Sequence, residues 1–253
     1  MNREELTSTG GSAGLAQEDT AGVAPEAGRS NGGLTGAAPF VAPFAIFVGM
    51  MAVEQTLGLP IAWTYPVRCV ATVLALLYFS RRAIPLRASA PVASVAIGVA
   101  VFLIWIGPDL LFGPGYRHSW IFENALLGKA GSSAPASLKT NLPFILVRII
   151  GCVAIVPVIE ELFWRGWLMR WLIGHDFRTV PIGAYTAPAF WITAVFFACE
   201  HGPYWEVGLA AGVIYNLLVV RARNLTDCIV AHAVTNGLLS AYVLMTGNWQ
   251  YWM

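Results

Sequence analysis

The stretch Val156-Pro-Val-Ile-Glu-Glu-Leu-Phe-Trp-Arg165 places two adjacent carboxylates, Glu160 and Glu161, at the end of a long apolar run. A charged side chain at the centre of a bilayer costs about 3 kcal/mol or more on insertion scales, so acids in such a run indicate a functional site. Glu161 and Arg165 stand four residues apart and can form an ion pair on one helix face. Glu160 has no such partner in the stretch and is the first candidate for a functional group.

The composition of the chain indicates that this stretch lies in lipid. Hydrophobic residues make up 57% of the 253 residues, charged residues only 11%, and the mean hydropathy is +0.64. A soluble domain carries about 25% charged residues. Because each membrane-spanning helix needs about 20 apolar residues, we predict an all-α fold, a polytopic transmembrane helix bundle of about seven spans, within a range of six to eight. The net charge of +1 gives no reason to expect a nucleic-acid partner.

Residues 1–38 differ from the rest of the chain. They are rich in Gly, Ala, Ser, Thr and Glu and contain no aromatic residue. Such a segment buries too little apolar surface to offset the entropy lost on ordering. We therefore predict a disordered tail over residues 1–38 and a single transmembrane helical domain over residues 39–253.

Each predicted span is an apolar run with Pro, Gly or basic residues at its ends. They cover about residues 40–59, 63–80, 91–112, 143–173, 182–199, 204–220 and 225–245. Glu54 and Arg68 lie near the turn between the first two spans, where a structural salt bridge is expected. The connection 113–141 is longer than most loops in compact domains. Two interpretations of it stay open, a short amphipathic helix on the membrane surface and an ordered surface loop.

The basic residues of the loops predict the orientation. One set of loops holds eight of them (Arg81, Arg82, Arg87, Arg165, Arg170, Arg178, Arg221 and Arg223) and the other holds three (Arg117, Lys129 and Lys139). The excess of basic residues marks the cytoplasmic side, so the N-terminus is expected in the cytoplasm. The low Lys content and the tail rich in Ala and Gly favour a bacterium of high genomic G+C. We expect an integral protein of the bacterial inner (plasma) membrane, with the lipid bilayer as a partner.

Further polar residues occur at helical spacing within or at the ends of the predicted spans. His201 follows Phe197 by four residues, and Asn236 follows His232 by four. Each pair therefore shares one helix face. Helical bundles build their sites from side chains that several helices direct at one cavity. These residues and the Glu pair are therefore expected to meet.

Three motifs thus occur in order on separate apolar segments: Glu160-Glu161-x-x-x-Arg165, Phe197-x-x-x-His201 and His232-x-x-x-Asn236. The set resembles that of the CAAX-protease and bacteriocin-processing (CPBP) family of intramembrane glutamate endopeptidases, over about residues 143–246. The resemblance implies a membrane-embedded hydrolase. Its substrate would be a membrane-associated or exported protein or peptide.

The resemblance also implies a role for each matching position. Glu160 and His201 would be the catalytic pair that activates a water, and His232 and Asn236 would donate hydrogen bonds to the oxyanion. Supporting positions would be Glu161, Arg165 and Phe197. This assignment agrees with the chemistry of amide hydrolysis, which needs a base for the water and donors aimed at the developing negative charge.

Two alternatives use the same residues. Glu160, His201 and His232 could bind zinc, although the sequence has no H-E-x-x-H and the family is understood as metal-free, so no cofactor is expected. The chain could instead be a membrane transporter or proton relay in which the same Glu and His residues carry protons. Many transporters show an internal repeat of their spans, and none is found here.

One geometric problem follows from the predicted spans. A fifth helix that begins at Ile182 would bring His201 to the outer membrane face, away from Glu160 and His232. Catalysis requires these groups to meet. Two interpretations stay open. Either this helix begins later, for example after Pro188, and is tilted or broken at Gly202-Pro203, since irregular backbone is tolerated where it lines a wet cavity, or the predicted bounds of the spans are wrong. The substrate itself is not indicated, although prenylated C-termini are not expected in a bacterium.

Overall fold

The computed structural model describes residues 34–84, 87–113 and 115–252, and these residues contain no β-strand. The predicted all-α class is confirmed. The first helix, α1 (Leu34–Leu57), begins earlier than the expected Phe40, because Leu34, Ala37 and Ala38 are good helix formers that extend the apolar run. The rest of the predicted tail, residues 1–33, lies outside the described residues.

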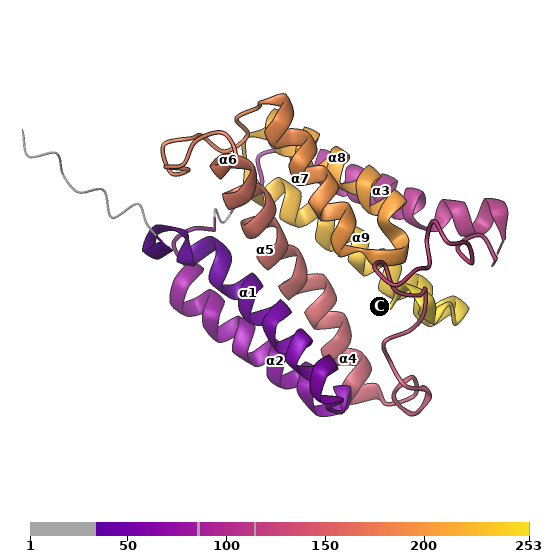
Figure 1. Cartoon of the computed structure of the whole chain (residues 1–253). Helices are drawn as coiled ribbons and strands as arrows, with labels where there is room; N and C mark the ends of the chain where they lie inside the picture. Colours follow the sequence, from indigo (N-terminus) through magenta and orange to yellow (C-terminus); the bar gives the residue numbers. More distant parts are fainter. Residues whose placement is uncertain (1–33, 85–86, 114, 253) are drawn as a thin grey trace, which may run out of the picture. The chain divides into compact units, whose positions relative to one another are not determined.

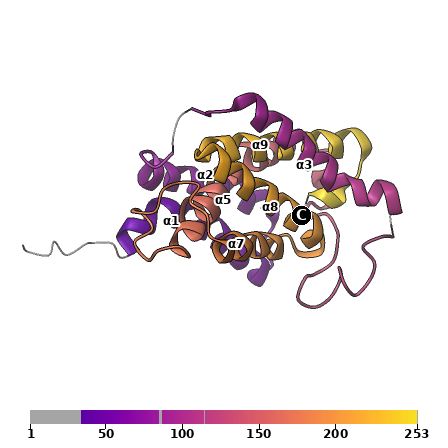
Figure 2. The same cartoon turned by 90° about the horizontal axis from the view of Figure 1, so that it is seen from above.

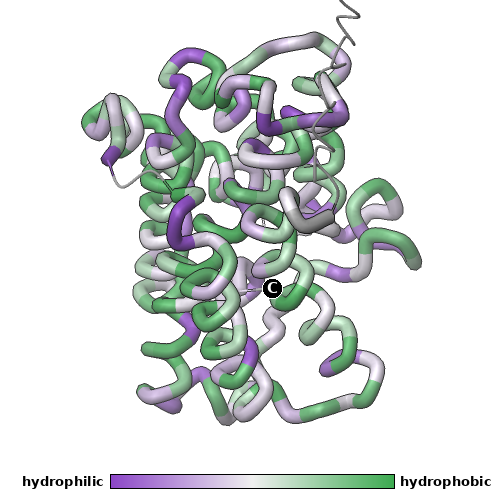
Figure 3. The backbone as a smooth tube through the Cα atoms, turned by 90° about the vertical axis from the view of Figure 1, so that its left-hand side faces the viewer, coloured by the Kyte–Doolittle hydropathy of each residue, from purple (hydrophilic) through white to green (hydrophobic). Residues whose placement is uncertain are grey.

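Six helices of the described part are long and apolar enough to cross a membrane. They cover Gly36–Leu57, Ile61–Ser80, Pro91–Phe112, Leu142–Trp171, Gly202–Ala222 and Leu225–Thr246. A seventh apolar helix, α7 (Ala187–Glu200), has 14 residues, which is about 21 Å and shorter than a hydrocarbon core. Apolar segments dominate these helices, whereas hydrophilic segments gather in several of the connections (Figure 3). A polytopic bundle with about seven apolar helices is therefore confirmed.

The bundle is arranged around one composite helix. This helix runs through α4 (Leu142–Ile150), α5 (Val156–Glu161) and α6 (Met169–Trp171). It lies between the α1–α2 pair, where α2 covers Ile61–Ala75, and a group formed by α3 (Pro91–Phe112), α7, α8 (Trp205–Ala222) and α9 (Leu225–Thr246) (Figures 1 and 2). The Glu pair at the end of α5 consequently faces helices from the second half of the chain.

Two π-helical segments, Gly151–Ile155 and Leu162–Leu168, interrupt the composite helix on either side of α5. Pro157 explains the first one, because a proline has no N–H and its ring clashes with the preceding turn of an α-helix. The N–H of Val156 bonds to the carbonyl of Gly151. The carbonyl of Cys152 is therefore left without a helical donor in both the α and the π register. Single-turn π segments are frequent at functional sites.

Small residues bring the helices of the second group close together. A side chain at Gly98 of α3 would collide with the backbone of Ala231 in α9, and the Gly98 carbonyl accepts a hydrogen bond from Thr235 at 2.9 Å. Gly212 of α8 lies against Ala194 of α7 in the same way. Close approach of this kind is the usual means of packing helices in membranes. It fixes α3 against α9 and α7 against α8.

A salt bridge was expected between the first two helices, near the turn that joins them. Arg68 pairs with Glu54 at 3.3 Å, so the expected salt bridge between α1 and α2 is confirmed.

The connection 113–141 is an ordered loop, and its described residues form only a short 3₁₀ turn at Ala136–Leu138. An amphipathic helix is excluded because Asn124 Oδ1 accepts from two successive N–H groups and Gly128, at φ 82°, closes a tight turn. Arg117 anchors the loop by pairing with Asp109 at 2.5 Å and with Glu206.

The helix that carries the second motif begins later than residue 182. Thr186 caps α7 by accepting from the N–H of Ala189, and Pro188 occupies its first turn. Both are typical of helix starts. The helix ends at Glu200, and Gly202 takes a positive φ of 51° before Pro203. The predicted start at Ile182 was therefore wrong, whereas a later start and a break at Gly202-Pro203 are confirmed.

Candidate active site

A cavity of about 610 Å³ lies inside the bundle, and all four residues predicted to be catalytic line it. Glu160 comes from α5, His201 from the end of α7, and His232 and Asn236 from α9. The short α7 allows this meeting, because it brings His201 to the depth of the other three. The structure thus places the side chains of three separate motifs around one space, and we describe each of them in turn.

Glu161 forms the centre of a buried polar cluster beside the cavity. Its side chain is fully buried, and its Oε1 accepts from Arg165 Nη1 at 3.1 Å. Arg165 also donates to Asn216 Oδ1 of α8 at 2.9 Å and to the Gly212 carbonyl. Its guanidinium lies 4.4 Å from the centre of the Phe197 ring. A buried charge is tolerated only when it is paired and hydrogen-bonded in this way.

His232 is bound to the same carboxylate from another helix. Its Nδ1 lies 2.9 Å from Glu161 Oε1, and its ring stacks on that of Tyr215 at 5.3 Å. A carboxylate only accepts hydrogen bonds, so this contact places a proton on Nδ1. The other ring nitrogen, Nε2, points toward Glu160, whose Oε2 lies 4.0 Å away. The imidazole is therefore oriented by Glu161 and directed at the neighbouring carboxylate.

Glu160 takes no part in the hydrogen bonds of this cluster. It is 8% exposed, and its Oε2 has no hydrogen-bond partner among the described residues. Buried carboxylate oxygens are nearly always hydrogen-bonded, so an unsatisfied one beside a cavity indicates a place for water or a ligand. The adjacent acids thus have different environments: Oε1 of Glu161 is bonded to Arg165 and His232, while Glu160 lines the cavity.

His201 lies at the C-terminal end of α7. Its Nδ1 is 2.6 Å from the carbonyl of Phe197, which can only accept, so Nδ1 carries the proton. The lone pair is then on Nε2. The ring packs edge-on against Trp105 of α3 at 5.1 Å and against Phe197 at 4.6 Å. A fixed tautomer with a free Nε2 is what a histidine base requires.

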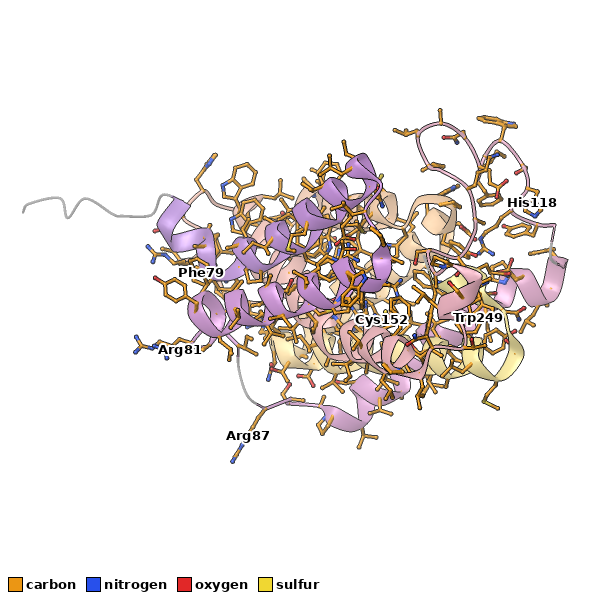
Figure 4. All side chains as sticks on the ribbon, turned by 90° about the horizontal axis from the view of Figure 1, so that it is seen from below. Phe79, Arg81, Arg87, His118, Cys152 and Trp249 are labelled. Carbon is orange, nitrogen blue, oxygen red and sulfur yellow. The ribbon has the colours of Figure 1, made fainter. Side chains whose placement is uncertain are left out.

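Asn236 is held by the irregular backbone of the composite helix. Its Nδ2 donates to the Cys152 carbonyl at 2.9 Å, and this is the carbonyl that the π-helical segment leaves without a helical donor. One amide hydrogen is used in this bond, and the second remains available to the cavity. Cys152 lies near the middle of the molecule, between Arg81 at one end and Trp249 at the other (Figure 4). The site is therefore deep within the bundle.

Several neighbours of the site were not among the predicted residues. Tyr215 and Asn216 of α8 support His232 and Arg165, Trp105 contacts His201, and Trp164 Nε1 donates to Glu200 Oε2 at 3.1 Å. Spacing along one helix gives no information about contacts between helices. A signal existed only for Asn216, which is a lone amide in an apolar helix and therefore expected to have a polar partner.

The residues do not fit a metal site. No three His, Cys, Asp or Glu side chains come together at ligand distance within the part of the chain that the structure describes. Zinc held by protein alone needs three or four ligands at about 2 Å. Glu160, His201 and His232 share the cavity, but the three side chains are not grouped closely enough to hold one metal ion. We therefore derive no chemistry through a metal.

The site lies inside a membrane bundle and combines a buried free carboxylate with an oriented imidazole and nearby amide and imidazole donors. This combination is typical of one class of protein, the intramembrane hydrolases. Residues 142–238, which contain all three motifs, match the family model described as type II CAAX prenyl endopeptidase Rce1-like. This segment is similar to that family, and the enzyme class that the match supports is a membrane protease. No curated protein and no solved structure matches the chain. The family favours the protease over the proton relay that the same residues could have formed.

Proposed function

We propose that the chain hydrolyses a peptide bond of a membrane-associated or exported protein inside this cavity, through a water activated by Glu160 and His201. The observation that carries the proposal is that Glu160, His201, His232 and Asn236 all line one cavity. These four groups supply the base and the oxyanion donors that amide hydrolysis requires.

The water-activating step is assigned to Glu160 and His201. Glu160 presents an unbound oxygen, and His201 presents Nε2 because its Nδ1 is bonded to Phe197. A water between them would lose a proton to the carboxylate as it attacks the carbonyl carbon. The proton is later returned to the leaving amine, which completes hydrolysis without a covalent intermediate. No cofactor is included in this scheme.

The oxyanion is assigned to His232 and Asn236. The free amide hydrogen of Asn236 and Nε2 of His232 lie on one face of α9, four residues apart. His232 can donate from Nε2 when both ring nitrogens carry protons, and the carboxylates of Glu160 and Glu161 supply opposite charge for this state. Donors that are already in place act most strongly on the charge that develops in the transition state.

Glu161, Arg165 and Phe197 are assigned a supporting role. Glu161 fixes the His232 ring, Arg165 neutralises Glu161, and Phe197 packs against both Arg165 and His201. None of the three needs to contact the substrate. Their effect is to hold the reacting groups within the small tolerances that catalysis demands.

The distribution of arginines over the two ends of the molecule supports an orientation in the membrane. Arg81 and Arg87 lie at one end of the molecule, and His118 and Trp249 lie at the opposite end (Figure 4). The arginine-rich loops support an orientation with that end in the cytoplasm, and with it the N-terminus. We propose the inner membrane of a bacterium as the location. The substrate would reach the cavity from the bilayer or from the membrane surface.

The test is cleavage by the purified full chain in nanodiscs, with a library of membrane-anchored peptides and mass spectrometry of the products. Glu160→Gln keeps the shape of the side chain and removes the base, so it should lower the rate by about 10²–10⁴. Asp176→Asn, the same carboxylate-to-amide change at an exposed position outside the spans, is the matched control. Cleavage by Glu160→Gln at the wild-type rate, in protein of unchanged thermal stability, would refute the assignment.

A further inference from the structure

The segment that follows the last long helix returns to the cavity. The helix α9 ends at Thr246, and Gly247 takes a positive φ of 73°, a conformation that ends helices and turns the chain sharply. A 3₁₀ turn, Trp249–Tyr251, comes next, and both Tyr251 and Trp252 line the cavity. We call residues 249–252 the strap. The proposed peptidase mechanism uses none of them.

The far end of the strap is bonded to the long loop 113–141. The N–H of Ser133 donates to the carbonyl of Trp252 at 2.8 Å, and Ser133 Oγ donates to the same carbonyl at 3.0 Å. Ser133 also lines the cavity. Two segments that are 119 residues apart in the sequence therefore meet at the wall of the cavity.

Two further hydrogen bonds join the strap to other elements. The hydroxyl of Tyr251 donates to Asp109 Oδ2 of α3 at 2.6 Å, and the hydroxyl of Tyr204 donates to the carbonyl of Gln250 at 3.3 Å. Tyr204 belongs to the 3₁₀ turn that directly follows His201. The strap thus spans from α3 to the turn beside a proposed catalytic residue.

The position of the strap against the cavity is only partly satisfied. Tyr251 is 8% and Trp252 3% exposed, yet Nε1 of Trp252 has no hydrogen-bond partner among the described residues. A buried donor without an acceptor costs free energy that is regained when the donor reaches water, and each of the hydrogen bonds that hold the strap contributes little net stability. Short segments held in this way are among the first to open locally.

We propose that the strap is a lid: it closes the cavity in the structure, and a substrate polypeptide enters when the strap swings away about Gly247. This inference rests on the proposed peptidase function and adds a regulation to it. When only the open state binds, the apparent affinity for substrate falls in proportion to the open fraction. Weakening the strap therefore lowers KM and leaves kcat unchanged.

A fixed wall is the alternative role for the same residues. A wall that holds Tyr204, and through it the turn after His201, would be needed for catalysis. Its loss would lower kcat and would not lower KM. The two roles thus differ in the sign of the effect on kcat/KM.

The first measurement reports opening without any substrate. Cys152 lines the cavity, Cys199 is exposed, and Cys69 and Cys228 are buried. In Cys199→Ala protein in nanodiscs, a charged thiol reagent that does not enter lipid should modify Cys152 at a rate proportional to the open fraction. Mass spectrometry of the labelled peptide identifies the site.

The variants change the strap at single bonds or side chains. Tyr251→Phe removes the hydrogen bond to Asp109 and should accelerate the labelling of Cys152 about fivefold, the factor that one lost hydrogen bond gives. Trp252→Ala removes a side chain that lines the cavity and should accelerate it further. Tyr251→Phe is the variant to use should Trp252→Ala fail to fold.

Two matched controls carry the same changes elsewhere. Tyr78 and Trp120 are about four-fifths exposed and do not line the cavity. Tyr78→Phe and Trp120→Ala should therefore keep the wild-type rate of Cys152 labelling and the wild-type KM.

The second measurement is cleavage of the membrane-anchored peptides by the same proteins. Both strap variants should show a KM lowered by the factor that accelerates labelling, with kcat unchanged. Unchanged labelling in both variants overturns the lid. Faster labelling with an unchanged or raised KM, or with a reduced kcat, makes the strap a wall of the site and also overturns it. Faster labelling in the strap variants alone, with no cleavage of any peptide by wild-type protein, supports the lid and overturns the peptidase.

Discussion

The Nδ1 of His232 lies 2.9 Å from Oε1 of Glu161, which also accepts from Arg165 at 3.1 Å. One carboxylate therefore connects a residue of the last helix to an arginine on its own helix. The two adjacent acids of the first motif consequently differ in function: Glu161 orients the imidazole, and Glu160 is left free for chemistry. This division explains why both acids occur in an apolar helix.

Glu161→Gln tests this contact. The change leaves the buried Arg165 charge without its counter-ion, which should lower the free energy of unfolding by about 3–5 kcal/mol. It also weakens the bond that orients His232, so kcat should fall with little change in KM. Thermal unfolding in detergent and the cleavage rate measure the two effects. Unchanged stability together with an unchanged rate would contradict the supporting role of Glu161.

Much of the fold could be predicted because a bilayer imposes simple rules. A span needs about 20 apolar residues, so composition and hydropathy were sufficient to predict the bundle. The start of α7 could be foreseen only as an alternative, since Ile182 and Gly183 continue the apolar run without being helical. The cap at Thr186, not hydropathy, decides where that helix begins.

The candidate site could be predicted in part for a related reason. Polar residues are costly in an apolar helix, so Glu160, His201 and His232 were conspicuous in the sequence. Which residues they contact was not predictable, because spacing reports only neighbours on one helix. The bond between Asn236 and the Cys152 carbonyl joins residues 84 positions apart and depends on a π-helical segment. Pro157 was the one hint of that irregularity.

The loop 113–141 should lose order in acid. Hydrogen bonds from His118 and from the N–H of Ala130 hold the pKa of Glu123 below its usual range. A lowered pKa means that the ordered loop gains stability above the pKa of the unfolded state, and that this gain is lost as the pH falls through the lower pKa of the ordered state. Hydrogen exchange of residues 119–130 should therefore accelerate below about pH 4. In Glu123→Gln protein the exchange should be faster already at pH 7 and should lack this acid step; an acid step of wild-type size in that variant would assign it to another group.

Activity should survive removal of metal. No cluster of three metal ligands occurs among the described residues. Purified protein dialysed against a strong chelator should retain its full cleavage rate, and elemental analysis should find no stoichiometric zinc. His232→Ala should lower the rate without changing the metal content. Loss of activity on chelation, restored by Zn²⁺ in proportion to the metal bound, would overturn the glutamate mechanism.

Asn236→Ala tests the proposed oxyanion donor. The side chain donates one amide hydrogen to the Cys152 carbonyl and leaves the other for the cavity. If the second hydrogen binds the oxyanion, its loss should lower kcat by about 10²–10³ and change KM little, because the bond is made mainly in the transition state. The variant also leaves a buried carbonyl without a donor, which should cost about 1–3 kcal/mol of stability.

Asn236→Asp keeps the shape of the side chain but turns an oxygen toward the same carbonyl, so it should be at least as inactive. Asn248→Ala, an amide deletion outside the cavity, should leave kcat unchanged. A lowered melting temperature for Asn236→Ala with an unchanged kcat would make Asn236 a structural residue and leave His232 as the sole donor proposed from α9.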